Sequence, residues 1–191
     1  MAVAKLGVFL AQRLREKGVA VDVKLVDRAC LLHDILRVCD FMESDYGTFE
    51  QRIPEQKKAK WQQLRARYKG TPHEYAAHDI LKQKYPALAL VIRKHRYMSL
   101  LDENENPKTW EEKLVYYADK RVMHDKIVPL KKRLCEGHKR NAHLHGTEAQ
   151  SQINTAKVDP LIYRLEKEIF DKVGLDPLEV TDEFIDLHGT R

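Results

Sequence analysis

Apolar side chains recur every three or four residues along most of this chain. In the first segment Val3, Leu6, Leu10 and Leu14 form one stripe, and another runs through residues 162–173. This spacing matches the 3.6-residue repeat of an amphipathic α-helix. The 191 residues include only 8 glycines and 7 prolines, which leaves few residues for the tight turns of a strand-rich fold. The pattern predicts a single all-α domain with no internal repeat and no strand pair.

Capping residues and prolines divide the chain into expected helices. Gly18 is suited to end the first helix, and Asp22 is suited to begin the second. Two T-x-x-E sequences, at 71–74 and 109–112, have the form of capping boxes that open helices. Other helices are expected from Pro86 and over residues 54–68, 128–140, 148–157 and 160–173, with a connector at 40–53 and a loosely packed acidic tail from 175 onward.

The composition excludes several classes of protein. Cys30, Cys39 and Cys135 form neither a CxxC pair nor an even-numbered disulfide framework, which favours a reducing cytosol. No apolar run approaches the roughly 18 residues that cross a bilayer. The net charge of +5 favours anionic partners such as phosphates, nucleotides or nucleic acid, although only weakly. We therefore expect a cytoplasmic protein that does not bind membranes.

The most informative segment is ACLLHDILR at residues 29–37, in which His33 and Asp34 interrupt an apolar helix. Burying two ionisable side chains is costly unless they are paired or bound to a metal. Neighbouring residues on a helix point about 100° apart and do not pair with each other, whereas a metal beside the helix can bind both. Asp34 has two carboxylate oxygens, so it could bridge two metals. Arg37 lies one turn further on, within reach of a phosphate held at the same place.

A lone His-Asp pair is more often structural, with the histidine bonded to a backbone carbonyl and the acid to an arginine. The chain contains two more such pairs, His78-Asp79 and His124-Asp125, in polar surroundings that indicate surface positions. The pair at His33 and Asp34 differs because other expected helices present further candidate ligands, namely His73, His95 and Asp119. Histidine and carboxylate ligands together suit Zn, Fe, Mn or Co better than Ca.

This ordered set of residues resembles the HD-domain metal-dependent phosphohydrolases. The resemblance covers roughly residues 1–135 and rests on the segments LLHDILR, PHEYAAHDIL, IRKHRYMS and LVYYADKRV. It implies a compact helical HD-domain bundle of about seven to nine helices. We expect residues 1–135 to form the metal-binding domain, and residues 136–191 to add C-terminal helices and the acidic tail, packed on the same domain.

The resemblance also implies roles for individual residues. His33, Asp34 and Asp119 would bind a first metal, and His73 and His95 a second, with Asp34 bridging both. The cofactor would be a divalent transition metal (Mn, Fe, Co, Ni or Zn), with one or two per chain. The candidates for binding phosphate are Arg37, Lys94, Lys120 and Arg121, and the candidate catalytic residues are Asp34, Arg37 and Lys94.

The family has an earlier histidine on its first helix, about three residues before a stretch like Ala2-Val3-Ala4. Residues 1–32 of this chain contain no histidine. Either the chain as given begins just past this ligand, which we expect, or the ligand is truly lost. The first metal site then has three protein ligands and a reduced metal affinity.

These features predict a hydrolase that cleaves a phosphate ester, such as that of a nucleotide, with a metal-activated water. The alternative is a catalytically degenerate HD domain that binds nucleotide or RNA as a regulator. A basic and aromatic helix near residues 55–69 supports that alternative, although a solvated face or a lid over an anionic substrate would give the same pattern. A third possibility is a helical interaction module. The histidines at 138, 143 and 145 indicate exposed polypeptide that picks up metal adventitiously.

Overall fold

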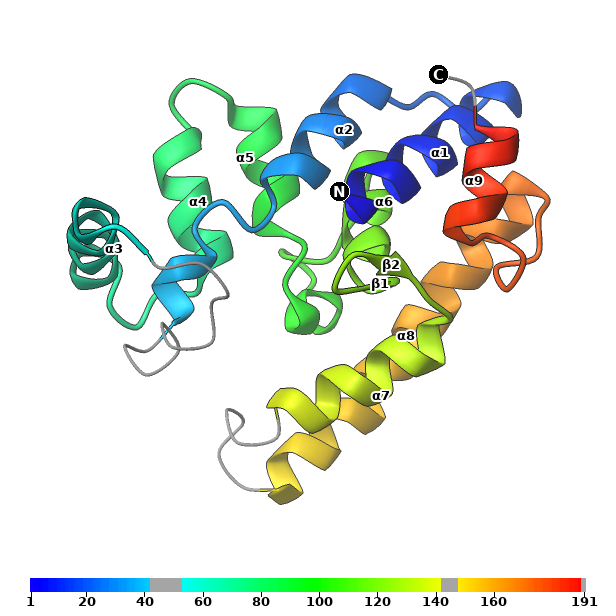
Figure 1. The fold of residues 1–191 in the computed structure, drawn as a ribbon. Helices are drawn as coiled ribbons and strands as arrows, with labels where there is room; N and C mark the ends of the chain where they lie inside the picture. Colours follow the sequence, from blue (N-terminus) through cyan, green and yellow to red (C-terminus); the bar gives the residue numbers. More distant parts are fainter. Residues whose placement is uncertain (42–52, 142–147, 190–191) are drawn as a thin grey trace.

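The computed structural model describes residues 1–41, 53–141 and 148–189 (Figure 1). The histidines at 143 and 145 lie outside these residues, and so does most of the expected connector at 40–53. The described helices are α1 (Ala2–Glu16), α2 (Val23–Leu32), α3 (Glu55–Arg67), α4 (His73–Leu81), α5 (Pro86–Arg93), α6 (Trp110–Asp119), α7 (Leu130–Asn141), α8 (Glu148–Val173) and α9 (Asp182–His188). Two short 3-10 helices are η1 (Arg37–Asp40) and η3 (Tyr97–Leu101). The all-α prediction is confirmed. None of the described helices combines the length and apolarity needed to cross a bilayer.

The core forms where α1 packs against α2 and α6. Leu6, Leu10 and Leu14 of α1 are fully buried, and so are residues 114–118 of α6. Each buried leucine contributes roughly 1.5–3 kcal/mol relative to an exposed one. α5 packs on α2 and α6 as well, so these three helices all contact one another.

The chain leaves the helical conformation earlier than expected after α2. The segment at residues 29–37 was expected to be helical throughout, but α2 ends at Leu32 with His33 as its C-cap. The chain then turns, with the amide of Arg37 donating to the carbonyl oxygen of Asp34 (2.9 Å), and continues as η1. His33 and Asp34 therefore lie at a helix end and not in the middle of a helix.

One of the two expected capping boxes is present. At α6 the Thr109 hydroxyl accepts from the amide of Glu112, and the Glu112 carboxylate accepts from the amide of Thr109. At α4 the N-cap is Pro72, whose side chain has no group that accepts a hydrogen bond. Thr71 lies one residue before the N-cap, so the expected capping box does not form. His73 is consequently the first residue of α4.

A short antiparallel strand pair was not expected from the sequence. β1 (Val122–Met123) pairs with β2 (Lys126–Ile127), with Val122 opposite Ile127. Strands of two residues are too short to produce an alternating pattern. His124 lies in the turn between them, with a left-handed φ of 57°.

The C-terminal part differs from prediction in two places. α8 is one helix that continues through Pro160, because Val158 and Ile162 on either side of it are fully buried and their packing outweighs the cost of a proline. The expected loose tail instead contains α9, which packs on α1 through Ile185 and an edge-on contact between Phe184 and Phe9. α7 and the N-terminal part of α8 project together from the other helices (Figure 1), while the rest of α8 contacts α1 and α6. The division of the chain at residue 135 stays a prediction.

Candidate metal centre and its pocket

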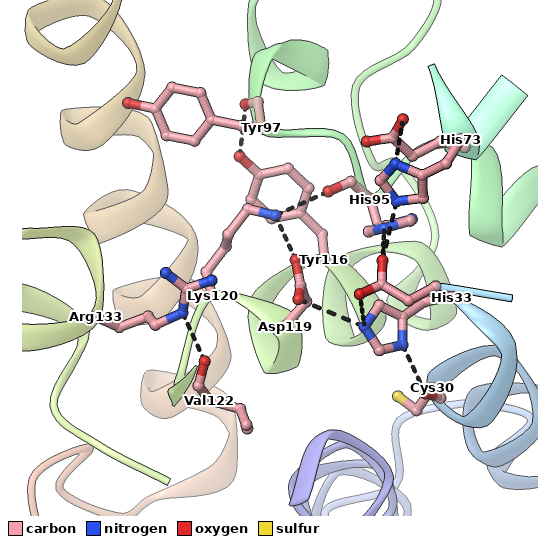
Figure 2. A network of polar contacts seen from close by, with 12 residues as sticks. Cys30, His33, His73, His95, Tyr97, Tyr116, Asp119, Lys120, Val122 and Arg133 are labelled. Atoms are coloured by element: carbon pink, nitrogen blue, oxygen red, sulfur yellow. Dashed lines mark hydrogen bonds and ion pairs between the residues drawn. The ribbon is translucent and has the colours of Figure 1, made fainter. Parts of the chain in front are cut away.

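The ends of α2, α4, α5 and α6 bring the five predicted ligands to one pocket. His33 caps α2 and Asp34 follows it, His73 begins α4, His95 lies just past α5, and Asp119 is the last residue of α6. Figure 2 shows the rings of His33, His73 and His95 gathered on one side, with Asp119 between them and Lys120. The role of these residues as metal ligands stays a prediction.

Asp34 occupies the middle of this cluster. Its Oδ1 lies 2.9 Å from Nε2 of His73 and 3.8 Å from Nε2 of His95, while its Oδ2 lies 3.7 Å from Nε2 of His33. Nε2 of His33 is also 3.5 Å from Oδ1 of Asp119. Ligand atoms that bind one metal at about 2.1 Å lie roughly 3.0–3.4 Å apart. The two oxygens of Asp34 thus face two groups of donors at near-coordination spacing.

His33 and His95 are fixed by hydrogen bonds on the far side of each ring. Nδ1 of His33 donates to the carbonyl oxygen of Cys30 (2.8 Å), and Nδ1 of His95 donates to that of Ile92 (2.5 Å). A carbonyl oxygen only accepts, so Nδ1 carries the proton and Nε2 of the neutral ring carries the lone pair. Histidines that bind metals are typically oriented in this way.

His73 is held by Asp40, a residue that the sequence analysis did not single out. Nδ1 of His73 lies 2.6 Å from Oδ2 of Asp40, whose Oδ1 accepts from the backbone amide of His73 (3.3 Å). The signal in the sequence was an acid in the apolar run VCDF. Asp40 falls at the start of the expected connector, so no local pattern linked it to His73.

The Nε2 atom of His73 shows that the cluster suits a cation. Only 2% of this residue is exposed, and Nε2 is a buried side-chain atom that has no hydrogen-bond partner among the described residues. It lies close to Asp34 but out of line for a hydrogen bond. A buried ring nitrogen that faces a carboxylate at this distance needs a positive charge between them, which either a proton or a metal ion supplies. The residues present therefore fit a divalent metal.

The electrostatics of the cluster favour positive charge at its centre. Partial burial works against ionisation of Asp34, but contacts with His73 and His95 hold its pKa far below the usual range. Burial likewise opposes ionisation of Asp119, whose pKa is held well below normal by Lys120 and His33. Both carboxylates are therefore charged at neutral pH. Burial lowers the pKa of His73, but Asp34 and Asp40 outweigh that effect and raise it to about 9.

Two of the four predicted phosphate-binding residues line the pocket. Arg37 is partly exposed, and its Nη1 lies 3.3 Å from Oδ2 of Asp40. Lys120 donates from Nζ to Oδ2 of Asp119 (2.6 Å) and to the carbonyl oxygen of His95 (3.0 Å). Both cations therefore border the candidate ligands.

Lys94 and Arg121 were expected at the same place, but the structure does not bring them to the pocket. Lys94 is buried, and its Nζ pairs with Oε1 of Glu112 at 2.9 Å. Arg121 is 1% exposed and donates to the carbonyl oxygens of Val128 (2.6 Å) and Pro177 (3.0 Å). Both side chains are bonded inside the protein. The structure therefore does not support the expected phosphate contacts of Lys94 and Arg121 or the catalytic role of Lys94.

The other His-Asp pairs have different settings. Asp79 accepts from the hydroxyl of Tyr68 (3.0 Å) and from Lys82 (2.7 Å), outside the pocket. His124 is exposed, yet it lines the pocket from the β1–β2 turn. Three more basic residues that the sequence did not single out for the site line the same cavity, namely Arg133, His138 and Arg140 of α7. Their place depends on how α7 folds back, which no local pattern reveals.

Comparison with known proteins gives one result. A family model described as the HD domain matches residues 1–123, which include all five candidate ligands and end before α7. No curated protein and no solved structure matches the chain.

Proposed function

The chain belongs to the HD-domain family, and on this premise we propose that it is a metal-dependent phosphohydrolase that cleaves a phosphate ester, with nucleotides as the substrate class. The observation that carries the proposal is the convergence of the Nε2 atoms of His33, His73 and His95 on the carboxylate of Asp34. An orphaned Nε2 at His73 adds to it.

The donor set indicates which metals the site would hold. His73, His95 and Asp34 offer ligand atoms that all lie within 4.8 Å of one another. His33 and Asp119, on the other side of Asp34, would complete a second position. Nitrogen and carboxylate donors suit Mn, Fe, Co, Ni or Zn. When bound, such a metal supplies a Lewis acid for the phosphoryl group and acidifies a water molecule.

The chain's own residues position the substrate around this centre. Arg37 and Lys120 place positive charge on the pocket wall beside the ligands, where it stabilises negative charge on phosphoryl oxygens. Lys120 is fixed by its bonds to Asp119 and to the backbone of His95. Asp40 keeps the imidazole of His73 in one orientation.

Metal analysis and hydrolysis assays test this function together. The purified chain is loaded with Mn²⁺, Fe²⁺, Co²⁺, Ni²⁺ or Zn²⁺ and assayed against a panel of nucleotides and phosphodiesters. We expect bound metal and phosphate release, both lost in His73→Ala. His78→Ala is the matched control, because His78 lies on the same helix outside the pocket. Metal binding and hydrolysis that survive in His73→Ala, or no hydrolysis with any metal, would contradict the proposal.

A regulatory role is the second candidate, and one observation favours it. α3 buries none of its residues, and residues 55–69 hold six basic side chains and one acidic one, a surplus equal to the chain's whole net charge of +5. Such a helix suits a polyanion such as RNA. Nucleotide or RNA binding by metal-free protein without hydrolysis, weakened by neutralising Lys60 and Arg67, would favour the regulator over the enzyme.

A further inference from the structure

The pocket extends beyond the metal cluster to α7 and to the β1–β2 turn. Its lining at this end includes basic side chains that the proposed function does not use: His124, Arg133, His138 and Arg140. All four follow residue 123, where the match to the family ends. The cavity measures about 520 Å³, several times the size of one phosphate group and within the roughly 300–1,000 Å³ typical of ligand pockets. A ligand therefore has room to reach both ends.

Arg133 is held so that part of its guanidinium group faces a ligand. Nε donates to the carbonyl oxygen of Val122 (2.6 Å), and Nη1 lies 3.1 Å from Oε2 of Glu136. None of its contacts with the described residues uses Nη2. The side chain is only 15% exposed and, in the view of Figure 2, lies on the far side of Asp119 from the three histidines. An anchored guanidinium is a good donor for a phosphate oxygen.

The α7 end carries a surplus of positive charge among the described residues. Arg133 and Arg140 share a single carboxylate, that of Glu136, at 3.1 and 3.4 Å. Both arginines line the pocket and Glu136 does not. Lys120, by contrast, is balanced by Asp119. A surplus of cations on a concave wall attracts an anionic group.

His138 is fixed in the same wall by α8. Its Nε2 lies 2.9 Å from Oδ2 of Asp159, and the other oxygen of Asp159 accepts from the hydroxyl of Tyr97 (2.7 Å). Tyr97 and His138 both line the pocket, with their rings in edge contact. The wall formed by α7 is thus braced by α8 rather than free to move alone.

We propose that α7 and the β1–β2 turn form a second anion subsite of this pocket, centred on Arg133 and Arg140, and that the substrate is a phosphate ester with a second phosphate group bound there. The proposal rests on the proposed function for the first phosphate, which the metal end takes. The subsite itself rests on the two arginines, their shared carboxylate and the size of the cavity.

Kinetics with two nucleotides test the substrate class. Arg133→Gln and Arg140→Gln remove the charge and keep a polar side chain, and Arg164→Gln removes the same charge from an exposed position of α8 outside the pocket. With Mn²⁺-loaded protein, kcat/KM for ADP should fall about tenfold, as for one lost charge-assisted hydrogen bond. The value for AMP should change less than about twofold, and Arg164→Gln should change neither. An equal loss for both nucleotides, or no loss for ADP, overturns the proposal.

Binding to metal-free protein separates this proposal from the proposed function. In EDTA nothing is hydrolysed, and calorimetric titration of each variant with ADP measures how much its arginine contributes to binding in the absence of metal. We expect ADP to bind about tenfold more weakly to Arg133→Gln and to Arg140→Gln, but not to Arg164→Gln. If no nucleotide is hydrolysed while this dependence holds, the proposed function fails and the anion subsite stands. An affinity for ADP that is unchanged in both arginine variants overturns the subsite, whatever the hydrolytic activity.

Folding of the variants is checked by circular dichroism and thermal melting. Arg133 bonds to the backbone of Val122, so its replacement could disturb the strand pair. Arg140 is 48% exposed and pairs only with Glu136 among the described residues. Arg140→Gln therefore carries the test if Arg133→Gln does not fold.

Discussion

The two ends of the pocket hold their charged groups in different ways. At the metal end, His73 and His95 are buried and each has Nδ1 bonded to a fixed acceptor. At the α7 end, Arg140 is about half exposed, and it shares Glu136 with Arg133. The first arrangement fixes ligand atoms, which a metal requires, whereas the second supplies charge with less fixed geometry. We infer that the metal end determines the reaction and the α7 end determines which substrates bind, so single substitutions should cost far more at the first end.

Asp34→Asn should have the largest effect. The amide has no charge to balance a cation, and Asp34 faces all three histidines of the cluster. We expect loss of bound metal and a fall of about a thousandfold in kcat/KM, the scale of removing a main electrostatic contributor. Metal content by elemental analysis and phosphate release measure the two effects.

Asp79→Asn is the control for that variant. Asp79 also follows a histidine, but it bonds to Tyr68 and Lys82 outside the pocket. It should leave metal content and activity unchanged. Equal losses in the two variants would mean that the loss in Asp34→Asn does not arise from the metal end.

Lys94→Met tests whether a buried residue near the metal end can affect stability without affecting activity. The variant leaves Glu112 buried without its ion-pair partner. Breaking a buried pair in this way costs about 3 kcal/mol or more in the free energy of unfolding, measured by urea denaturation. The folded variant with saturating metal should keep its kcat/KM, because Lys94 does not reach the pocket. A specific loss of activity at unchanged stability would restore the phosphate-binding role first expected for Lys94.

Asp40→Asn removes the charge that orients His73 but leaves the imidazole in place. Loss of a group that orients a metal ligand typically weakens metal binding by about 10–100-fold. We expect a shift of this size in a Mn²⁺ or Co²⁺ titration, with activity recovered at high metal. Asp171→Asn, which removes an exposed acid paired with Lys167 on α8, is the control. An unchanged titration for Asp40→Asn would show that η1 does not support the metal end.

The sequence predicted the composition of the metal end but not of the α7 end, for a physical reason. His33 and Asp34 were identifiable because polar residues in an apolar segment need a partner, and His73, His95 and Asp119 joined them through the ordered set that resembles the HD-domain family. Which basic residues join them depends on where each helix stops. Lys94 and His95 are adjacent, yet one turns inward to Glu112 and the other lies at the pocket.

The α7 end depends on tertiary structure alone. Arg133 and Arg140 lie in a polar helix whose sequence is typical of a solvated face. Only the packing of α7 on α8 and the strand pair bring them to the cavity. Asp159 shows the same limit, because it lies 62 residues from Tyr97 in the sequence. Such pairings leave no trace in local periodicity, so they could not be predicted.

Asp159→Asn should have the smallest effect and is the finest test of the contrast. Asparagine keeps one oxygen that accepts from Nε2 of His138, and its amide can donate to the hydroxyl of Tyr97, which accepts as well as donates. The wall formed by α7 therefore stays in place with one weaker hydrogen bond. KM for ADP should rise about two- to tenfold, the range for a single hydrogen bond. Both kcat and metal content should stay unchanged. If metal binding weakens as much as in Asp40→Asn, or if kcat falls at saturating metal, then α8 supports the metal end too, and the two ends work as one unit.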